Sequence, residues 1–222
     1  MKVDKEKDNE LLKAGVKFLP FVGDSYEYGI SFDEEGKLVL GTEEKPGKKV
    51  LVLGESHYSE DGDVEPSFTR DVMEYFLEAK KDENWQSWMN TFLKFERSFF
   101  NRETSHEDSN SFWNHVVFYN YLQVPLGSPR MVGSPIDFEH SSLPFYNVLK
   151  LYKPDYIIVW GYRLYSHLPE KNGKEGACLS GNIETWEYVI DNANVKVLPI
   201  YHPSVGFSWK YWHNVIMELI KG

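Results

Sequence analysis

Short apolar runs alternate with longer amphipathic segments over most of the chain. The clearest run is KVLVLG (49–54), an unbroken apolar stretch typical of a strand that is buried on both faces. Three further runs predict strands: VVFYNYL (116–122), DYIIVWG (155–161) and NVKVLPIYHPS (194–204). Strands that alternate with helices favour a parallel sheet covered on both faces. We therefore expect an α/β fold, namely a three-layer α/β/α sandwich around a mostly parallel sheet of about four strands.

Apolar residues at helical spacing predict the helices between these strands. In 84–100, tryptophan and phenylalanine side chains recur at helical intervals and are expected in the core: Trp85, Trp88, Phe92, Phe95 and Phe99. The other predicted helices are 67–81, 138–154, 162–168 and 209–221. Segment 106–114 predicts a loop or a short helix start, and 169–176 a surface loop. Each predicted strand is thus followed, directly or after a loop, by a predicted helix.

The first 47 residues carry a different pattern. Residues 1–12 are highly charged and predict a solvated tail or a frayed helix start. Within 18–41, ISF and KLVL flank the turn residues DEEG (33–36), which predicts a small β-hairpin. The chain is long enough for one domain with a full core. We expect residues 1–222 to form a single domain in which 1–47 are an N-terminal annex.

Charge and cysteine content exclude several kinds of site. The formal net charge is −10, which repels nucleic acid, so a DNA-binding surface must collect cations locally. The single cysteine, Cys178, excludes an intramolecular disulfide and any all-cysteine iron–sulfur or zinc site. Five histidines lack the HxxxH or HxH spacing of metal ligands and are expected to be surface or structural residues: His106, His115, His140, His167 and His213. We expect neither a metal nor a cofactor.

Hydropathy gives an expectation for location. No apolar run approaches the length that spans a membrane, and the N-terminal residues MKVDKEKDNE lack the apolar core of a signal peptide. We therefore expect a cytoplasmic monomer without a membrane partner.

Polar side chains end or follow all four predicted strands. They are found in ESHY (55–58), at Asn120, in GYR (161–163) and in HPS (202–204). Because ligands bind at the carboxyl ends of parallel strands, we expect these groups at one edge of the sheet. Each also has a plainer explanation: ESHY as a solvated loop, Asn120 as a buried structural amide, and His202 as part of a turn before proline.

Three motifs in order resemble the uracil-DNA glycosylase superfamily. GESHY (54–58) is similar to the family's GQDPY or GEAPG loop, FYNYL (118–122) to its LLLNT strand, and HPS (202–204) to its His-Pro-Ser turn. PDYIIVWG (154–161) resembles the third strand, so that the resemblance covers residues 48–222. It implies hydrolysis of the N-glycosyl bond of uracil or another altered base. The implied partner is DNA with an altered base, or a free nucleobase or nucleotide, and no cofactor is implied.

The resemblance also implies roles for individual residues. His202 would donate a hydrogen bond that stabilises the departing base, and Asn120 would read the edge of a flipped pyrimidine. Phe68 is the candidate for the ring that stacks on the base. Tyr58 aligns with a tyrosine that crowds the pyrimidine 5-position.

The water-orienting positions depart from the family's pattern. Ser56 stands where the GQDPY form has an aspartate, and serine is a much weaker base. Glu55 aligns with the glutamate of the GEAPG form and is the other candidate. Residues expected to contact DNA are Arg130, Ser134, Ser204 and Lys210, with Arg70, Arg163 and the backbone amides of Gly127, Ser128 and Gly133 as further candidates near this edge.

Three function classes stay open at this stage. The first is a DNA glycosylase, and the second is a non-catalytic module that holds a nucleobase or nucleotide in the same pocket. The third is an esterase-like hydrolase, because LGESHY (53–58) also resembles the Gly-Glu-x-x-His strand ends of the erythromycin-esterase-like hydrolases. There Glu55 and His57 would perform acid–base chemistry. Asn120 and the His-Pro-Ser turn favour the first two classes.

Overall fold

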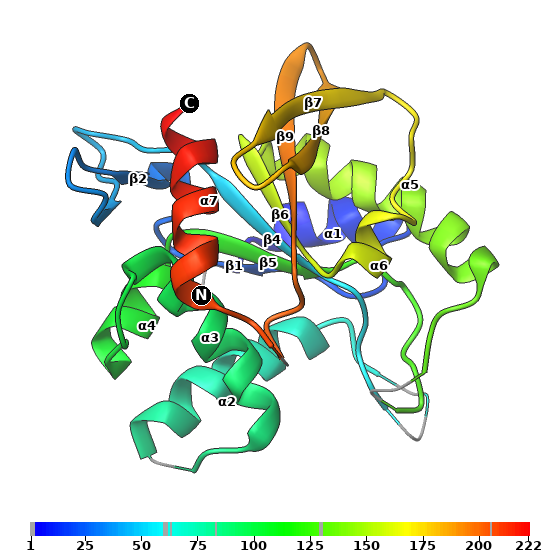
Figure 1. Ribbon diagram of the computed structural model, residues 1–222. Coiled ribbons are helices and arrows are strands. Elements are labelled where there is room, and N and C mark those ends of the chain that lie inside the picture. The colour runs from blue at the N-terminus through cyan, green and yellow to red at the C-terminus, as the bar shows by residue number, and fades with distance from the viewer. Residues whose placement is uncertain (1–2, 60–61, 63, 83, 129–130, 205) are drawn as a thin grey trace.

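The computed structural model describes residues 3–59, 62, 64–82, 84–128, 131–204 and 206–222. Its centre is a seven-stranded mixed sheet in the order β1-β5-β4-β6-β9-β8-β7, with helices on both faces (Figure 1). The α/β class predicted from the alternating apolar runs is therefore confirmed.

Four neighbouring strands form the parallel part of the sheet. They are β5 (Val116–Asn120), β4 (Val50–Gly54), β6 (Tyr156–Trp160) and β9 (Ala193–Ile200). Strand β4 pairs in parallel with both β5 and β6, and β6 pairs in parallel with β9. Every residue of β4, β5 and β6 is buried, as expected of strands covered on both faces. These are the four strands that the apolar runs predicted.

Three antiparallel strands extend this sheet, so the expected number of about four is wrong for the sheet as a whole. Strand β1 (Phe21–Val22) pairs with β5 at one edge. At the other edge β8 (Ile183–Ile190) pairs with β9, and β7 (Gly173–Leu179) pairs with β8. The predicted surface loop 169–176 therefore runs into a strand. These edge strands lack an unbroken apolar run because one is two residues long and the others have exposed positions.

Helices form a layer on each face of the sheet (Figure 1). On one face the core combines residues of α1 (Lys5–Lys13) and α5 (Pro135–Tyr152) with Leu51 and Leu53 of β4. On the other face Val50 and Val52 pack with residues of four helices: α2 (Phe68–Asp82), α3 (Asn90–Phe100), α4 (His106–Trp113) and α7 (Trp209–Lys221). The alternation along β4 thus separates two cores. Among the described residues, none of the helices is both long and apolar enough for a membrane span.

Helix boundaries differ from the predicted ones mainly at N-termini. The predicted helix 84–100 is a short turn, η2 (Ser87–Met89), followed by α3, and segment 106–114, predicted as a loop or a short helix start, forms the helix α4. Helices α4 and α5 each begin with a capping box, in which the serine at N-cap accepts from the backbone N–H of Asp108 or Asp137. This Ser-x-x-Asp pattern is present in the sequence and marks both starts.

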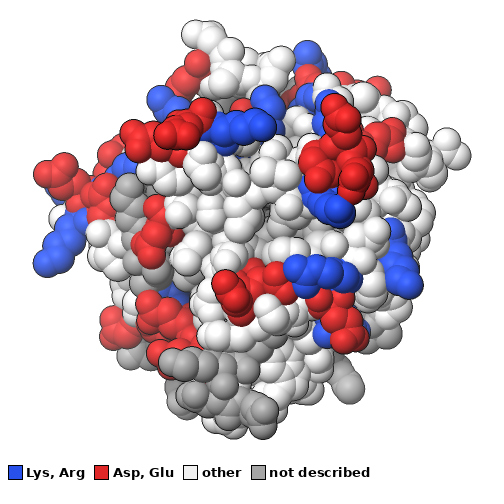
Figure 2. All heavy atoms as spheres, turned by 90° about the vertical axis from the view of Figure 1, so that its left-hand side faces the viewer, with Lys and Arg blue, Asp and Glu red and all other residues white. Residues whose placement is uncertain are grey.

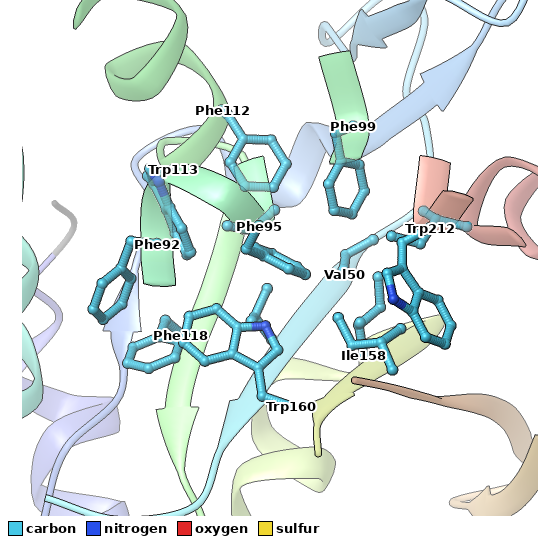
Figure 3. Packing of buried hydrophobic residues seen from close by; sticks show 14 of the residues in the cluster. Val50, Phe92, Phe95, Phe99, Phe112, Trp113, Phe118, Ile158, Trp160 and Trp212 are labelled. Carbon is cyan, nitrogen blue, oxygen red and sulfur yellow. The ribbon is translucent and has the colours of Figure 1, made fainter. Parts of the chain in front are cut away.

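Aromatic side chains fill the core beneath α3 and α4 (Figure 3). Phe92, Phe95 and Phe99 of α3 are buried, which confirms the sequence prediction for these rings. Phe95 lies edge-on to Trp160 of β6 at 5.1 Å between ring centroids, and Phe92 lies edge-on to Phe118 of β5 at 5.2 Å. Edge-to-face contacts of this kind stabilise aromatic cores beyond simple burial. This layer fixes the position of β6, whose end leads to the candidate site.

The N-terminal residues are tied to the rest of the fold. Strands β2 (Ile30–Phe32) and β3 (Leu38–Leu40) pair antiparallel, which confirms the predicted hairpin. A short turn, η1 (Tyr26–Tyr28), precedes it. Phe32 of the hairpin lies edge-on to His213 of α7, with 5.6 Å between ring centroids. The annex therefore contributes one edge strand, one helix and a packed hairpin.

Candidate functional site

The carboxyl ends of the four parallel strands bring the main predicted site residues to one edge of the sheet. Glu55 follows β4, Asn120 ends β5, and His202 follows β9. Arg163 lies in α6 (Tyr162–Tyr165), which begins directly after β6. The register supports this placement, since Gly54 is paired with Asn120 and Trp160 with Ile200. Glu55, Asn120, Arg163 and His202 are called the rim residues below.

Glu55 is held by Arg163. The Nε of Arg163 donates to Oε2 of Glu55 at 2.9 Å, and Nη2 donates to Oε1 at 2.8 Å. Glu55 is 8% exposed, whereas the side chain of Arg163 is 48% exposed. The hydrogen bonds that Arg163 donates to Glu55 raise the pKa of Arg163 above its ordinary value. Arg163, which the sequence placed at this edge as a further DNA-contact candidate, therefore orients the carboxylate of Glu55.

His57 is buried beneath the rim. Its Nε2 lies 2.9 Å from Oγ1 of Thr69, and its ring lies edge-on to Phe18 and Phe68, each at 5.0 Å between centroids. Burial lowers the pKa of His57 to about 3, so the ring is neutral at pH 7. An esterase-like reaction that uses His57 would require a substrate that penetrates below the surface.

Asn120 contacts His57 rather than backbone partners alone. Its Nδ2 lies 3.2 Å from Nδ1 of His57, and the residue is 7% exposed. Its Oδ1 packs on Gly54, where an added Cβ would lie 2.2 Å away. Both ends of the amide therefore contact buried groups, and a base that it reads must enter below the surface of the rim.

His202 is the rim residue that reaches the surface as an uncharged ring. Its Nδ1 lies 2.9 Å from Oγ of Ser204, and the ring lies edge-on to Trp160 at 6.0 Å between centroids. Although the residue is exposed, protein atoms around the ring lower its pKa to about 4, and the charge of Arg163 contributes. His202 is therefore neutral at pH 7. If the Ser204 hydroxyl donates to Nδ1, the ring proton is on Nε2.

The other predicted catalytic and base-binding residues surround this edge. Oγ of Ser56 is buried and has no hydrogen-bond partner within the described part of the chain. A buried hydroxyl without a partner is costly and indicates a position for a water or a ligand atom. Tyr58 is 40% exposed, and Phe68 is half-buried against His57. Phe68, the candidate for base stacking, thus packs on the buried His57 ring.

The residues predicted to contact DNA lie in different parts of the structure. Ser134 caps α5, Ser204 contacts His202, and Lys210 lies over the Trp209 ring at 5.3 Å. Arg130 lies outside the described residues. The expectation for Arg70 is wrong, because this residue is 5% exposed and binds Asp8 in the interior.

Two exposed tyrosines beside the rim were not among the predicted base-binding residues. Tyr162 precedes Arg163 and is 40% exposed, and Tyr201 precedes His202 and is 57% exposed. Their rings lie 5.6 Å apart between centroids. Their signal in the sequence was their place at the ends of predicted strands. Exposed rings at such positions provide surfaces on which a base can stack.

Charge is mixed on the face that Figure 2 shows, where basic side chains form separate small groups among acidic ones. On that face there is no continuous basic band that follows a nucleic-acid backbone. Within the described ranges, no three His, Cys, Asp or Glu side chains are placed to hold a metal ion.

The contact between Gly54 and Asn120 gives a first prediction. Replacing Gly54 with alanine is expected to lower the free energy of unfolding by about 1–3 kcal/mol, because the added Cβ overlaps Oδ1 of Asn120. Urea denaturation measures the change. The control is Gly127→Ala, whose Cβ would meet only the flexible Met131 side chain at 3.3 Å. Equal losses in the two variants would contradict the prediction.

The burial of His57 gives a second prediction, for the pH dependence of stability. The unfolded chain binds a proton at His57 near pH 6.5, whereas the native state binds it only near pH 3. Stability from this residue is therefore complete above pH 6.5 and falls as the pH drops towards 3, with a slope of up to about 1.4 kcal/mol per pH unit. Denaturant titrations of wild type and His57→Asn between pH 7 and 4 should show the shallower slope in the variant. Parallel slopes would overturn the prediction.

Comparison with known proteins adds no family to this description. No protein-family model matches the chain, and no curated protein matches it in sequence. The function is therefore argued from the rim residues and their geometry.

Proposed function

We propose that the protein is a DNA glycosylase-like enzyme that hydrolyses the N-glycosyl bond of uracil or another altered base. The observation that carries the proposal is the neutral, surface-reaching His202 next to the Glu55–Arg163 pair at the carboxyl ends of the parallel strands. If the Ser204 hydroxyl donates to Nδ1, the ring presents an Nε2–H donor to a ligand.

The chemistry requires groups of this kind in this arrangement. When the bond between base and sugar breaks, the base leaves with the electron pair and negative charge grows on its oxygen, while positive charge grows on the sugar. The Nε2–H of His202 would stabilise the base anion. The carboxylate of Glu55, oriented by Arg163, would face the sugar cation and position the water that adds to it. The added water then loses a proton to solvent, and the departed base anion takes up a proton, so that the products are the sugar hydroxyl and the neutral base.

Recognition of the base follows from the groups around His202. Asn120 offers both a donor and an acceptor for the edge of a pyrimidine. The exposed rings of Tyr58, Tyr162 and Tyr201 offer surfaces for stacking, which contributes about 1–3 kcal/mol per base. Stacking is not opposed by the net charge of −10, and it favours an unpaired or flipped base as the bound group.

One observation favours the non-catalytic alternative as the second candidate. Both carboxylate oxygens of Glu55 accept hydrogen bonds from Arg163, and Ser56 is a weak base, so neither is an activated general base. A module that binds a nucleobase or nucleotide needs no such base. The esterase-like alternative has less support, because His57 is 4% exposed and enclosed by Phe18 and Phe68.

The test is an assay for abasic sites. Labelled single- and double-stranded oligonucleotides that carry uracil, hypoxanthine or hydroxymethyluracil are incubated with the protein and cleaved with alkali. We expect strand cleavage at one of these bases and none in a matched oligonucleotide with normal bases only. If every altered base stays intact while a free base or nucleotide binds in calorimetry, the proposal fails in favour of the binding module.

A further inference from the structure

A hollow of about 480 Å³ has two walls. One is the β7–β8 hairpin, and the other is the segment from Tyr165, at the end of α6, to Glu170. None of the rim residues lines it. Its volume falls within the roughly 300–1,000 Å³ typical of small-molecule sites. The hairpin is at the edge of the sheet opposite β1, and the places of the hairpin and α6 can be followed in Figure 1. None of the residues that line this hollow was a candidate site residue.

The alternation along the hairpin determines which side chains face the hollow. Glu184, Trp186 and Tyr188 alternate along β8 and therefore share one face. On β7, Glu175 is paired with Trp186 and Cys178 with Glu184, so these residues share that face, and all five line the hollow. Tyr165 and Glu170 line it from the side of α6.

Negative charge on this face is not neutralised. No lysine or arginine among the described residues lines the hollow. Within the described residues, Glu170, Glu175 and Glu184 form no salt bridge. The lysine of the hairpin, Lys174, instead binds Glu187 at 3.3 Å on the opposite face. Glu184 also contributes to the raised pKa of Tyr165, after burial, which places its charge near that ring.

Partly exposed aromatic rings stand beside these carboxylates. Tyr165 and Trp186 are both half-buried, and the face of an aromatic ring attracts cations. Carboxylates supply the opposite charge, and the rings supply the apolar surface that an alkyl group requires.

We propose that this hollow is a second binding site, for an organic cation of the alkylammonium class, with Glu175 and Glu184 as counter-charges and the Trp186 and Tyr165 rings as cation–π partners. The proposal does not depend on the glycosylase reaction, because it uses none of the rim residues.

Cys178 provides a direct test because it is the only cysteine, is exposed and lines the hollow. Its alkylation by neutral iodoacetamide is followed by mass spectrometry, with increasing butyltrimethylammonium chloride or sodium chloride at equal ionic strength. We expect butyltrimethylammonium to slow alkylation saturably and sodium chloride not to do so. Equal effects of the two salts would overturn the proposal.

Variants of the hairpin identify the groups responsible. Glu184→Gln should weaken the protection, whereas the matched control Glu187→Gln, on the opposite face of the same strand, should leave it unchanged. Trp186→Leu should weaken the protection about two- to fivefold, the range that a partly exposed cation–π contact gives. Circular dichroism checks that each variant is folded. Identical weakening by Glu184→Gln and Glu187→Gln would show only the general attraction of an acidic protein for cations, and would also overturn the proposal.

Discussion

Replacing His202 with alanine is expected to slow base excision about 100- to 1,000-fold under single-turnover conditions, while the affinity for DNA changes little. A hydrogen-bond donor that is aimed at developing charge acts mainly in the transition state, and its removal typically has an effect of this size. The neutral ring of His202 and its contact with Ser204 make it the donor that the site geometry supports best. Rapid-quench kinetics on the oligonucleotide that the wild type cleaves measures the chemical step.

Two comparisons make this experiment specific. His140→Ala removes an exposed histidine of α5 and should retain the wild-type rate. Ser204→Ala should produce a smaller loss than His202→Ala, because it removes the group that orients the ring and leaves the donor in place. Equal rates for His202→Ala and wild type would contradict the proposed role of His202. If weaker DNA binding accounts for the whole decrease in excision rate, His202 acts in ground-state binding instead of in the transition state.

The sequence predicted the parallel part of the fold because its strands are buried on both faces. An unbroken apolar run as short as Val50–Leu53 is typical of a buried strand, and the glycine that follows marks the end of that strand. Edge strands lack this signal. In β8 (IETWEYVI), strand-forming residues are present, but Glu184 and Glu187 interrupt the apolar run.

The site could be predicted only in part, for a similar reason. Strand ends determine which backbone positions meet at one edge, and this placed Glu55, Asn120 and His202 together. The pairing of Glu55 with Arg163 joins residues 108 positions apart and depends on how α6 turns after Gly161. Local sequence carries no signal for such a pair.

The sequence also contained no indication that a charged residue, Arg70, would be buried. Arg70 follows Thr69 near the start of a helix, where an arginine is usually solvated, yet it lies inside the fold. Its Nη1 and Nη2 donate to Asp8 at 2.8 and 2.6 Å, and its Nε donates to the carbonyl of Pro20 at 3.0 Å. These three bonds connect α2 to α1 and to the segment before β1. Arg70 therefore anchors the N-terminal annex.

Replacing Arg70 with alanine is accordingly expected to lower the free energy of unfolding by about 3–5 kcal/mol, because the charge of Asp8 is then buried without its partner.

Arg102 provides a matched control, since it binds Asp108 with the same two-bond geometry, at 2.7 and 2.8 Å, but its side chain is 56% exposed. Arg102→Ala should cost about 1 kcal/mol or less. Guanidinium denaturation of both variants measures the two losses in free energy of unfolding. Equal losses would show that the buried ion pair stabilises the fold no more than the exposed one does. The double variant Asp8→Leu/Arg70→Met should regain most of the lost stability, because it removes the uncompensated charge and fills the space with apolar side chains.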